Sequence, residues 1–143
     1  MTQLMNYLPK EHIQVKDKIS TWQEAVKITS QPLLEEKKIT PVYVENMIDS
    51  VYQNGPYMVL ADYFALMHAK PGIGVCKQSM SLLVTKNEVD LAGKPIKIFL
   101  VLAATDSASH LESLQEIMEV FMDEEKYQLI LKGNLTDVIQ VFQ

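Results

Sequence analysis

Residues 96–104 read IKIFLVLAA, an almost unbroken apolar run with a single lysine. A strand that is apolar at nearly every position is covered on both faces, as in the centre of an α/β sheet. Residues 57–67 and 79–85 are also rich in aromatic, aliphatic and β-branched side chains, which predicts further strands. A weaker alternation of apolar and polar side chains over residues 13–19 predicts a short, half-exposed strand. Together these patterns favour a sheet with a buried centre.

Two helices are predicted before the buried strands. Thr21 and Glu24 form a capping box, which predicts a helix start there, and Pro32 is expected to bend or divide the second half of this helix. The second helix has signals at both ends. Thr40 is its cap, proline follows at the first helical position, and Gly55 lies just past its end.

Three further helices are predicted after residue 104. A capping box at Ser109 and Glu112 opens the first of them. Its expected buried stripe comprises Leu111, Leu114, Ile117, Met118 and Phe121. The next helix runs over residues 123–132 and ends at Gly133, and residues 136–142 form a last short helix. This order of elements, with connections long enough for parallel pairing, predicts a single α/β domain over residues 1–143, with a mixed β-sheet and helices packed on both faces.

The composition of the 143 residues excludes several classes of protein. An apolar content of 48% is too high for intrinsic disorder, and a formal net charge of -5 argues against a nucleic-acid partner, which requires a basic face. The single cysteine, Cys76, rules out a disulfide scaffold and is expected to be a small buried side chain. No apolar run approaches the roughly 18 residues of a membrane helix, and residues 1–10 lack a signal-peptide pattern. We therefore expect a cytoplasmic protein.

The first two histidines have different sequence surroundings. His12 lies among charged and polar residues and is expected to be a solvated surface side chain. His68 follows the apolar residues 64–67 and precedes a Pro-Gly turn, so it lies where a buried strand leaves the sheet. In open α/β sheets this edge collects ligands and reacting groups. Position alone leaves two hypotheses for His68, a functional residue or a hydrogen-bonded structural one.

The third histidine, His110, follows the apolar run by a few residues and is predicted in the first turn of a helix. The unpaired N–H groups and partial positive charge of a helix amino terminus attract phosphate and disfavour an imidazolium ion. We therefore expect His110 to be neutral, with a lowered pKa, and to lie close to His68 at one edge of the sheet. The alternative is a histidine that only caps its own helix.

Other chemistries have little support in the sequence. A zinc site needs three or four ligands, and only Asp106 and Cys76 are near the histidines, without a CxxC or HxxxH spacing. The sequence Gly72-Ile73-Gly74 falls short of a Walker loop or a dinucleotide-binding motif. No metal or other cofactor is therefore expected.

Five segments of the chain carry a resemblance to a known family. They are residues 40–55, 55–61, 65–71, 80–83 and 103–111. Together they resemble the mannitol/fructose family of sugar phosphotransferase-system (PTS) enzyme IIA components, and most of all the ascorbate-specific IIA proteins. In those proteins a Gly-Pro-Tyr segment precedes the active-site strand and a Ser-His-Leu segment opens the later helix. Tyr57 and His110 lie in the matching segments of this chain.

The resemblance implies a cytoplasmic phosphotransferase. It implies that His68 is the phosphorylated nucleophile, which accepts a phosphoryl group from phospho-HPr, and that His110 stabilises the phosphate. A IIB component is the implied acceptor, in L-ascorbate uptake, and the membrane IIC component takes part only indirectly. The alternatives are a regulatory IIA-like protein of the nitrogen-PTS type, which controls a transporter or transcription factor, and a non-catalytic binding domain with structural histidines.

The chain departs from the family pattern at two places. Met67 stands where family members usually have proline, directly before the active histidine. Asp49-Ser50 stands where the mannitol and fructose members place an arginine late in a helix. The missing arginine removes a countercharge for the phosphate, which shifts its stabilisation onto His110 and backbone N–H groups.

The surface around His68 can also be predicted. Phosphotransfer partners meet transiently, through interfaces at the low end of the usual size range. We therefore expect a small exposed apolar collar around His68, drawn from Tyr63, Met67 and Ile73. Most of the eight methionines are instead expected to fill gaps in the core.

Overall fold

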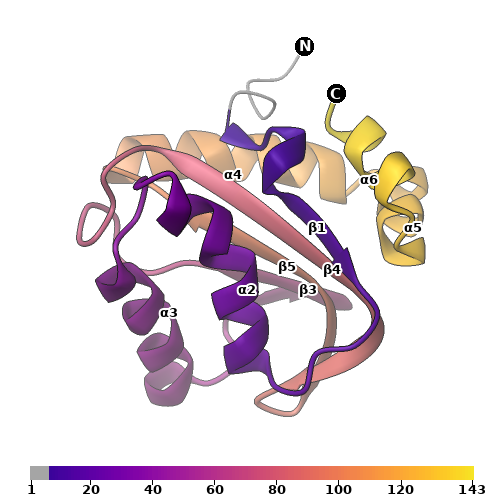
Figure 1. Ribbon diagram of the computed structural model, residues 1–143, viewed down its shortest axis with the longest axis horizontal. Helices are drawn as coiled ribbons and strands as arrows, with labels where there is room; N and C mark the ends of the chain where they lie inside the picture. Colours follow the sequence, from indigo (N-terminus) through magenta and orange to yellow (C-terminus); the bar gives the residue numbers. More distant parts are fainter. Residues whose placement is uncertain (1–6) are drawn as a thin grey trace.

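The computed structural model describes residues 7–143 and contains one five-stranded sheet (Figure 1). The strands are β1 (Ile13–Lys16), β2 (Val59–Ala61), β3 (Tyr63–Met67), β4 (Ser79–Leu91) and β5 (Lys94–Ala103), in the spatial order β1-β4-β5-β3-β2. The prediction for residues 1–10 lies partly outside the described residues. The prediction that the apolar run forms a central strand is confirmed by the position of β5.

The sheet is mixed, as predicted. β3 pairs parallel with β5, and β1 pairs parallel with β4, whereas the β4–β5 and β2–β3 pairs are antiparallel. The strand predicted over residues 57–67 is divided into β2 and β3, because the chain reverses at Asp62 and Tyr63 takes a positive φ of 70°. The strand predicted over residues 13–19 ends earlier, at Lys16.

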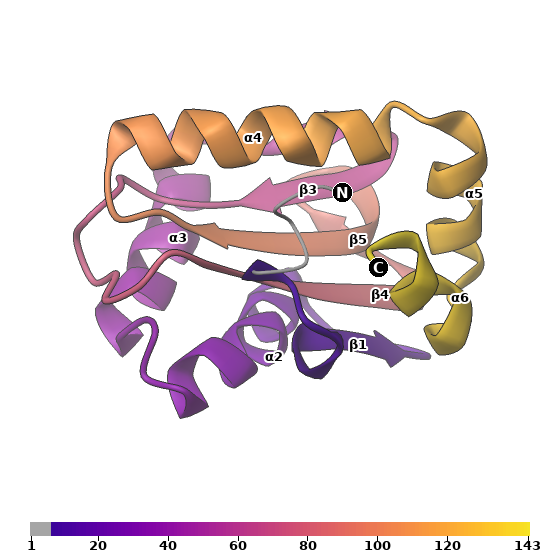
Figure 2. The ribbon, with the colours of Figure 1, turned by 90° about the horizontal axis from the view of Figure 1, so that it is seen from above.

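Helices cover both faces of the sheet, which confirms the predicted fold class (Figure 2). On one face lie α2 (Trp22–Glu35) and α3 (Pro41–Asn54); on the other lie α4 (Ser107–Phe121), α5 (Glu124–Lys132) and α6 (Leu135–Val141). A short 3₁₀ turn, η1 (Lys10–His12), precedes β1. Along β5, successive side chains alternate between the two cores, so Phe99 faces α2 and α3 while Leu100 faces α4.

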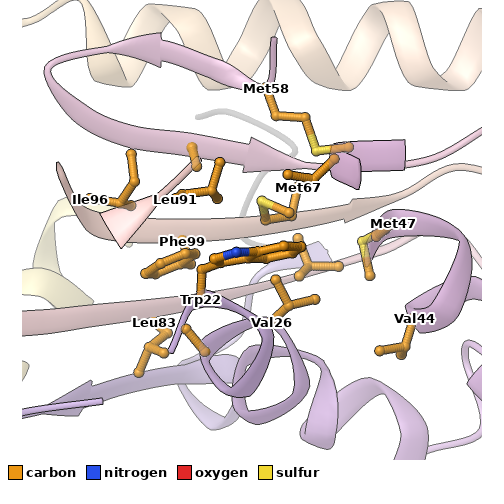
Figure 3. Close-up of a cluster of buried hydrophobic side chains, with 14 of the residues drawn as sticks. Trp22, Val26, Val44, Met47, Met58, Met67, Leu83, Leu91, Ile96 and Phe99 are labelled. Carbon is orange, nitrogen blue, oxygen red and sulfur yellow. The ribbon is translucent and has the colours of Figure 1, made fainter. Parts of the chain in front are cut away.

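The core on the α2 and α3 face gathers large side chains from helices and strands (Figure 3). Trp22, Met47, Met67 and Phe99 all point into it, and Met67 has no exposed surface. Because Met67 ends β3 on this inward side, it belongs to the core. Its predicted place in an exposed collar was wrong.

Helix α2 is not divided at Pro32, contrary to one form of the prediction. Proline has no N–H to donate to the carbonyl four residues earlier, which is that of Ile28. The Nε2 of Gln14, in the neighbouring strand β1, donates to this carbonyl at 2.8 Å. A strand side chain thus replaces the missing helical hydrogen bond.

Helix α4 begins at Ser107, earlier than a capping box at Ser109 predicts, and its buried face agrees with the predicted stripe at Ile117 and Phe121 but not at Leu111. Its cap is Asp106, whose carboxylate accepts from the Ser109 N–H at 2.8 Å, so the capping box predicted at Ser109 is wrong. The buried residues are Ser113, Ile117, Val120 and Phe121. Leu111, predicted in the buried stripe, is 57% exposed, because the buried face runs through Ser113 instead. The ends of α5 at Asp123 and Gly133 agree with prediction.

His12 is completely buried, so its prediction as a surface residue was wrong. Its Nδ1 lies 2.9 Å from the Met80 carbonyl of β4, and its Nε2 lies 2.8 Å from a carboxylate oxygen of Glu36 at the end of α2. Lys38 pairs with the other carboxylate oxygen at 3.0 Å. Hydrogen bonds from Lys38 and His12 together hold the pKa of the Glu36 carboxyl below its ordinary value.

Cys76 is also placed differently from its prediction. Its side chain is exposed, in the loop between β3 and β4. The backbone N–H of Cys76 donates to the Lys38 carbonyl, which fixes the loop against the connection between α2 and α3. The side chain therefore faces outward and fills no gap in the core.

Candidate functional site

The two remaining histidines meet at one edge of the sheet. β3 and β5 are parallel neighbours, so their carboxyl ends lie at the same edge. His68 directly follows β3, and His110 lies at the start of α4, which follows β5. The centroids of the two imidazole rings are 5.4 Å apart, with 49° between the ring planes. The prediction that the two side chains lie close together is confirmed.

The orientation of the His68 ring is fixed by its own strand. Nδ1 lies 2.7 Å from the Leu66 carbonyl oxygen, which can only accept a hydrogen bond. Nδ1 therefore carries the proton, and in the neutral ring Nε2 keeps its lone pair. The side chain is half-buried, and within residues 7–143 Nε2 has no hydrogen-bond partner. His68 thus presents a nucleophilic nitrogen at an accessible edge.

His110 is half-buried beside it, and its pKa is lowered, as predicted. Burial is the main cause of the lowered pKa, and the neighbouring His68 contributes further. A neutral His110 keeps one N–H as a donor and adds no charge to the site. The cause differs from the prediction, which assigned the lowered pKa to the helix amino terminus.

The amino terminus of α4 carries its own carboxylate. Asp106 accepts from the Ser109 N–H, and this hydrogen bond is the main reason that the pKa of the Asp106 carboxyl is lowered. The ionised side chain complements the positive end of the helix dipole. It therefore offsets the attraction for phosphate that the helix terminus was expected to provide.

A buried tyrosine that was not predicted to serve the site joins the two strands behind the histidines. The Tyr43 hydroxyl donates to the Leu102 carbonyl of β5 at 2.6 Å and accepts from the Ala69 N–H at 3.1 Å. Burial raises the pKa of Tyr43 to about 12, so the hydroxyl keeps its proton. One side chain of α3 therefore fixes the residue after His68 to the end of β5. The sequence signal for this role was a tyrosine, with its polar hydroxyl, on the buried face of α3.

The loop that follows His68 is tied down at several points. The Gly72 N–H donates to the Ala104 carbonyl and the Thr40 N–H to the Gly74 carbonyl, both at 2.9 Å. Gly74 has a φ of 78°, and a Cβ there would lie 2.8 Å from the Tyr43 nitrogen, so only glycine fits.

Gln78 connects the end of this loop to α4. Its Oε1 accepts from the Thr105 N–H at 3.3 Å, and its Nε2 donates to the Ser113 hydroxyl at 2.6 Å. Ser113 lies one turn after His110 on the same helix. The loop that begins at His68 therefore also supports the helix that carries His110.

Tyr57 forms a third side of the site. Its ring meets the His68 ring edge-on, with centroids 5.8 Å apart and 81° between the planes. The Tyr57 hydroxyl lies 2.7 Å from the hydroxyl of Ser50 in α3, which also accepts from the Asn54 side chain at 3.4 Å. The sequence marked Tyr57 only as part of a Gly-Pro-Tyr segment and assigned it no role.

The apolar surface near the histidines differs in part from the expected collar. Ile73 is exposed, as predicted. Tyr63 begins β3, and at about 3.3 Å per residue it lies about 16 Å along the chain from His68, so it is at the wrong end of the strand. The exposed apolar residues that lie next to the site in sequence or space are instead Tyr57, Ile73 and Leu111.

The described part of the chain contains no cluster of three or more histidine, cysteine, aspartate or glutamate side chains that could hold a metal ion. None of the helices in residues 7–143 is long and apolar enough to cross a membrane.

The fold and the histidine pair define a class of α/β proteins that hold two neighbouring imidazoles at one edge of a mixed sheet. The chain matches the family described as "Phosphoenolpyruvate-dependent sugar phosphotransferase system, EIIA 2" over residues 6–143, and it belongs to this family. It is therefore a IIA sugar phosphotransferase component of the PTS. The family resemblance predicted from the sequence is confirmed.

Named relatives support the same family. The chain is 34% identical over 142 residues to the mannitol-specific cryptic phosphotransferase enzyme IIA component of Escherichia coli K12, covering 95% of this chain and 97% of that protein. It is also 34% identical over 119 residues to the ascorbate-specific PTS system EIIA component of the same strain, covering 80% of this chain and 77% of that one. The solution structure of the E. coli cryptic mannitol-specific IIA aligns with a TM-score of 0.92 at 31% identity, covering 99% of this chain and 98% of the other.

Proposed function

We propose that this protein is a phosphocarrier in which Nε2 of His68 accepts a phosphoryl group from phospho-HPr and passes it to a IIB component. The observation that carries the proposal is the hydrogen bond from His68 Nδ1 to the Leu66 carbonyl. It leaves the lone pair on Nε2, at a half-exposed position beside a neutral imidazole. Imidazole in this state is a good phosphoryl acceptor, and its phosphoramidate is reactive enough to pass the group on.

Each transfer exchanges one bond to phosphorus for another. In the first, the Nε2 lone pair of His68 attacks phosphorus, a P–N bond to the histidine of HPr breaks, and the electron pair returns to that histidine. In the second, a cysteine thiolate of the IIB component attacks, and the P–Nε2 bond breaks. His68 keeps its proton on Nδ1 throughout, because the Leu66 carbonyl holds it there. The protein positions the groups and stabilises the phosphoryl oxygens.

We assign the stabilisation of these oxygens to His110. All thirteen basic residues of the chain are lysines, so no arginine is present to form a bidentate pair with the phosphate. A neutral His110 donates one hydrogen bond to the phosphoryl group from its N–H. Because it is neutral, it supplies this N–H without adding a positive charge beside His68.

We further propose that the pathway served is L-ascorbate uptake. Ascorbate-specific IIA components are among the relatives at 34% identity. Cryptic mannitol-specific components reach the same identity, so identity does not separate the two sugars. Asp49-Ser50 in place of the arginine of mannitol and fructose members favours the ascorbate branch.

The test is transfer of labelled phosphate. The purified chain is incubated with enzyme I, HPr and labelled phosphoenolpyruvate, and the label is mapped by peptide. We expect an acid-labile, base-stable adduct on residue 68. The labelled chain is then offered IIB components of the ascorbate and mannitol classes, and we expect faster transfer to the ascorbate class. Transfer to neither class would favour the regulatory alternative, and no labelling by phospho-HPr would contradict the phosphocarrier role itself.

A further inference from the structure

Tyr57 contacts the His68 ring, yet the phosphotransfer steps above assign it no part. We propose that Tyr57 is a positioning residue, whose ring, tethered through Ser50, holds the His68 imidazole in the orientation that presents Nε2. This inference rests on the proposed function, because it explains how the acceptor nitrogen is kept available. It concerns the free protein before any partner binds.

The need for a support follows from the freedom of a histidine side chain. The terminal torsion of histidine has a broad, roughly two-fold profile. The orientation with Nδ1 at the Leu66 carbonyl therefore competes with one in which the ring is flipped. A flip moves Nδ1 away from that carbonyl and changes which nitrogen faces outward. His110 lies on one side of the ring at 5.4 Å, and Tyr57 lies edge-on at 5.8 Å. Together the two rings limit the space into which the imidazole can turn.

Tyr57 itself needs an anchor, because it is 47% exposed and lies in the loop after α3. The loop begins at Gly55, which caps α3 with a φ of 75°, and only three residues separate Gly55 from β2 at Val59. The hydrogen bond between the hydroxyls of Tyr57 and Ser50 ties the far end of the ring to α3 at 2.7 Å. Asn54 holds the Ser50 hydroxyl from the same helix. The ring is therefore fixed at its hydroxyl and at its edge.

The chain supplies a matched control in Tyr52. This tyrosine is also largely exposed, at 66%, and its ring packs against an aromatic neighbour, Trp22, with centroids 5.5 Å apart. Its hydroxyl also has a side-chain partner, accepting from Gln23 at 2.7 Å. Loss of Tyr52 therefore removes the same kinds of contact as loss of Tyr57, away from the histidines.

The experiment compares Tyr57→Leu, Tyr57→Phe, Ser50→Ala and Tyr52→Leu with the parent chain. His68 is phosphorylated with two donors, phospho-HPr and the small molecule phosphoramidate, which needs no docking surface. We expect Tyr57→Leu to slow labelling by both donors about three- to tenfold, the range that an aromatic edge contact can supply. Tyr57→Phe and Ser50→Ala, which keep the ring but lose the tether, should slow it less, and Tyr52→Leu should stay within about twofold.

A second measurement reports the ring directly. Nitrogen NMR of the imidazoles should show His68 as the Nδ1–H tautomer in the parent and in Tyr52→Leu, and as a mixture of tautomers in Tyr57→Leu. Thermal unfolding of each variant checks that the fold is retained. If Tyr57→Leu does not fold, Tyr57→Phe and Ser50→Ala carry the test, because both retain the ring.

Three outcomes would overturn the proposal. An unchanged tautomer together with parent rates in Tyr57→Leu would show that the ring does not position His68. Slower labelling by phospho-HPr but not by phosphoramidate would make Tyr57 a docking residue instead. Equal losses in the Tyr52 and Tyr57 variants would indicate a general loss of structure. If phospho-HPr does not label the parent, the proposed function fails, and phosphoramidate and NMR still decide the role of Tyr57.

Discussion

His12 and His68 make the same first hydrogen bond and differ in the second. Each has Nδ1 next to a backbone carbonyl, at 2.9 Å from Met80 and 2.7 Å from Leu66. The Nε2 of buried His12 is hydrogen-bonded to Glu36. The Nε2 of His68 lies at the open edge of the sheet and has no hydrogen-bond partner in the described residues. The hydrogen bond to a carbonyl is therefore common to buried His12 and to His68, the proposed phosphoryl acceptor. The state of the other nitrogen separates them.

Replacing each histidine by alanine tests this difference most strongly. We expect His68→Ala to accept no phosphate from phospho-HPr, because the acceptor nitrogen is gone. We expect His12→Ala to be labelled at close to the parent rate wherever it remains folded. Labelling by radioactive phosphoenolpyruvate, with folding checked by circular dichroism, measures both. Normal labelling of His68→Ala would remove the distinction between the two histidines.

Changing His110 tests how much phosphoryl transfer at Nε2 of His68 depends on the neighbouring imidazole. His110→Ala keeps the nucleophile but loses about 1.5 to 3 kcal/mol of charge-assisted hydrogen bonding to the phosphoryl group. We therefore expect transfer to slow about ten- to a hundredfold, less than the complete block at His68. His110→Gln keeps a donor and should recover part of the rate. An alanine variant with unimpaired single-turnover transfer would return His110 to a structural role.

The two alanine variants should rank in the opposite order in their effect on the stability of the fold, with the larger loss in His12→Ala. His12→Ala leaves the Met80 carbonyl without its partner and opens a cavity, which we expect to cost about 2 to 3 kcal/mol. His68→Ala, at a half-exposed position, should cost less. Urea unfolding at neutral pH measures both. His12→Asn, whose amide can reach the place of Nδ1, should restore part of the loss, and an equal cost for the two alanine variants would contradict the contrast.

The smallest expected effect is on the stability of the fold at acid pH. Hydrogen bonds from Lys38 and His12 lower the pKa of the Glu36 carboxyl below its ordinary value of 4.5. A lowered pKa in the folded state means that this stabilisation is present above pH 4.5 and is lost as the pH falls through the folded value. Because Glu36 is 43% exposed, the change should be small. The urea midpoint of the parent should fall as the pH drops below 4.5, and this fall should be smaller in Glu36→Gln. If the two plots of midpoint against pH run parallel, the ionisation of Glu36 does not contribute to the acid sensitivity of the fold.

The sequence predicts best what local patterns determine. The apolar run of β5 indicated a central strand, and the ends of two buried strands brought His68 and His110 to one edge. The burial of His12 was not predicted because its partners, Glu36 and Met80, lie 24 and 68 residues away along the chain. The charged neighbours of His12 describe the surface next to it, and its burial comes from β4 and α2.

The same physical reason explains the other differences. Tyr43 serves the site through backbone groups 26 and 59 residues away, which no helical periodicity can reveal. The face of α4 is set in part by the polar bond between Gln78 and Ser113, so a stripe drawn from apolar residues alone selected Leu111 wrongly. Contacts between distant segments decide these features, and they concern polar atoms in buried places.

The turn between β4 and β5 has a consequence for how the molecule assembles. Ala92 and Gly93 connect the paired residues Leu91 and Lys94, with φ values of 50° and 94°, the left-handed conformation of a tight two-residue hairpin. This hairpin closes a short loop, whereas β3 must cross over to reach β5 and pays more chain entropy. We expect the hairpin to form early and the edge that joins His68 to His110 to form late. Acceptance of phosphate by a refolding chain would then mark the moment at which β3 has paired with β5.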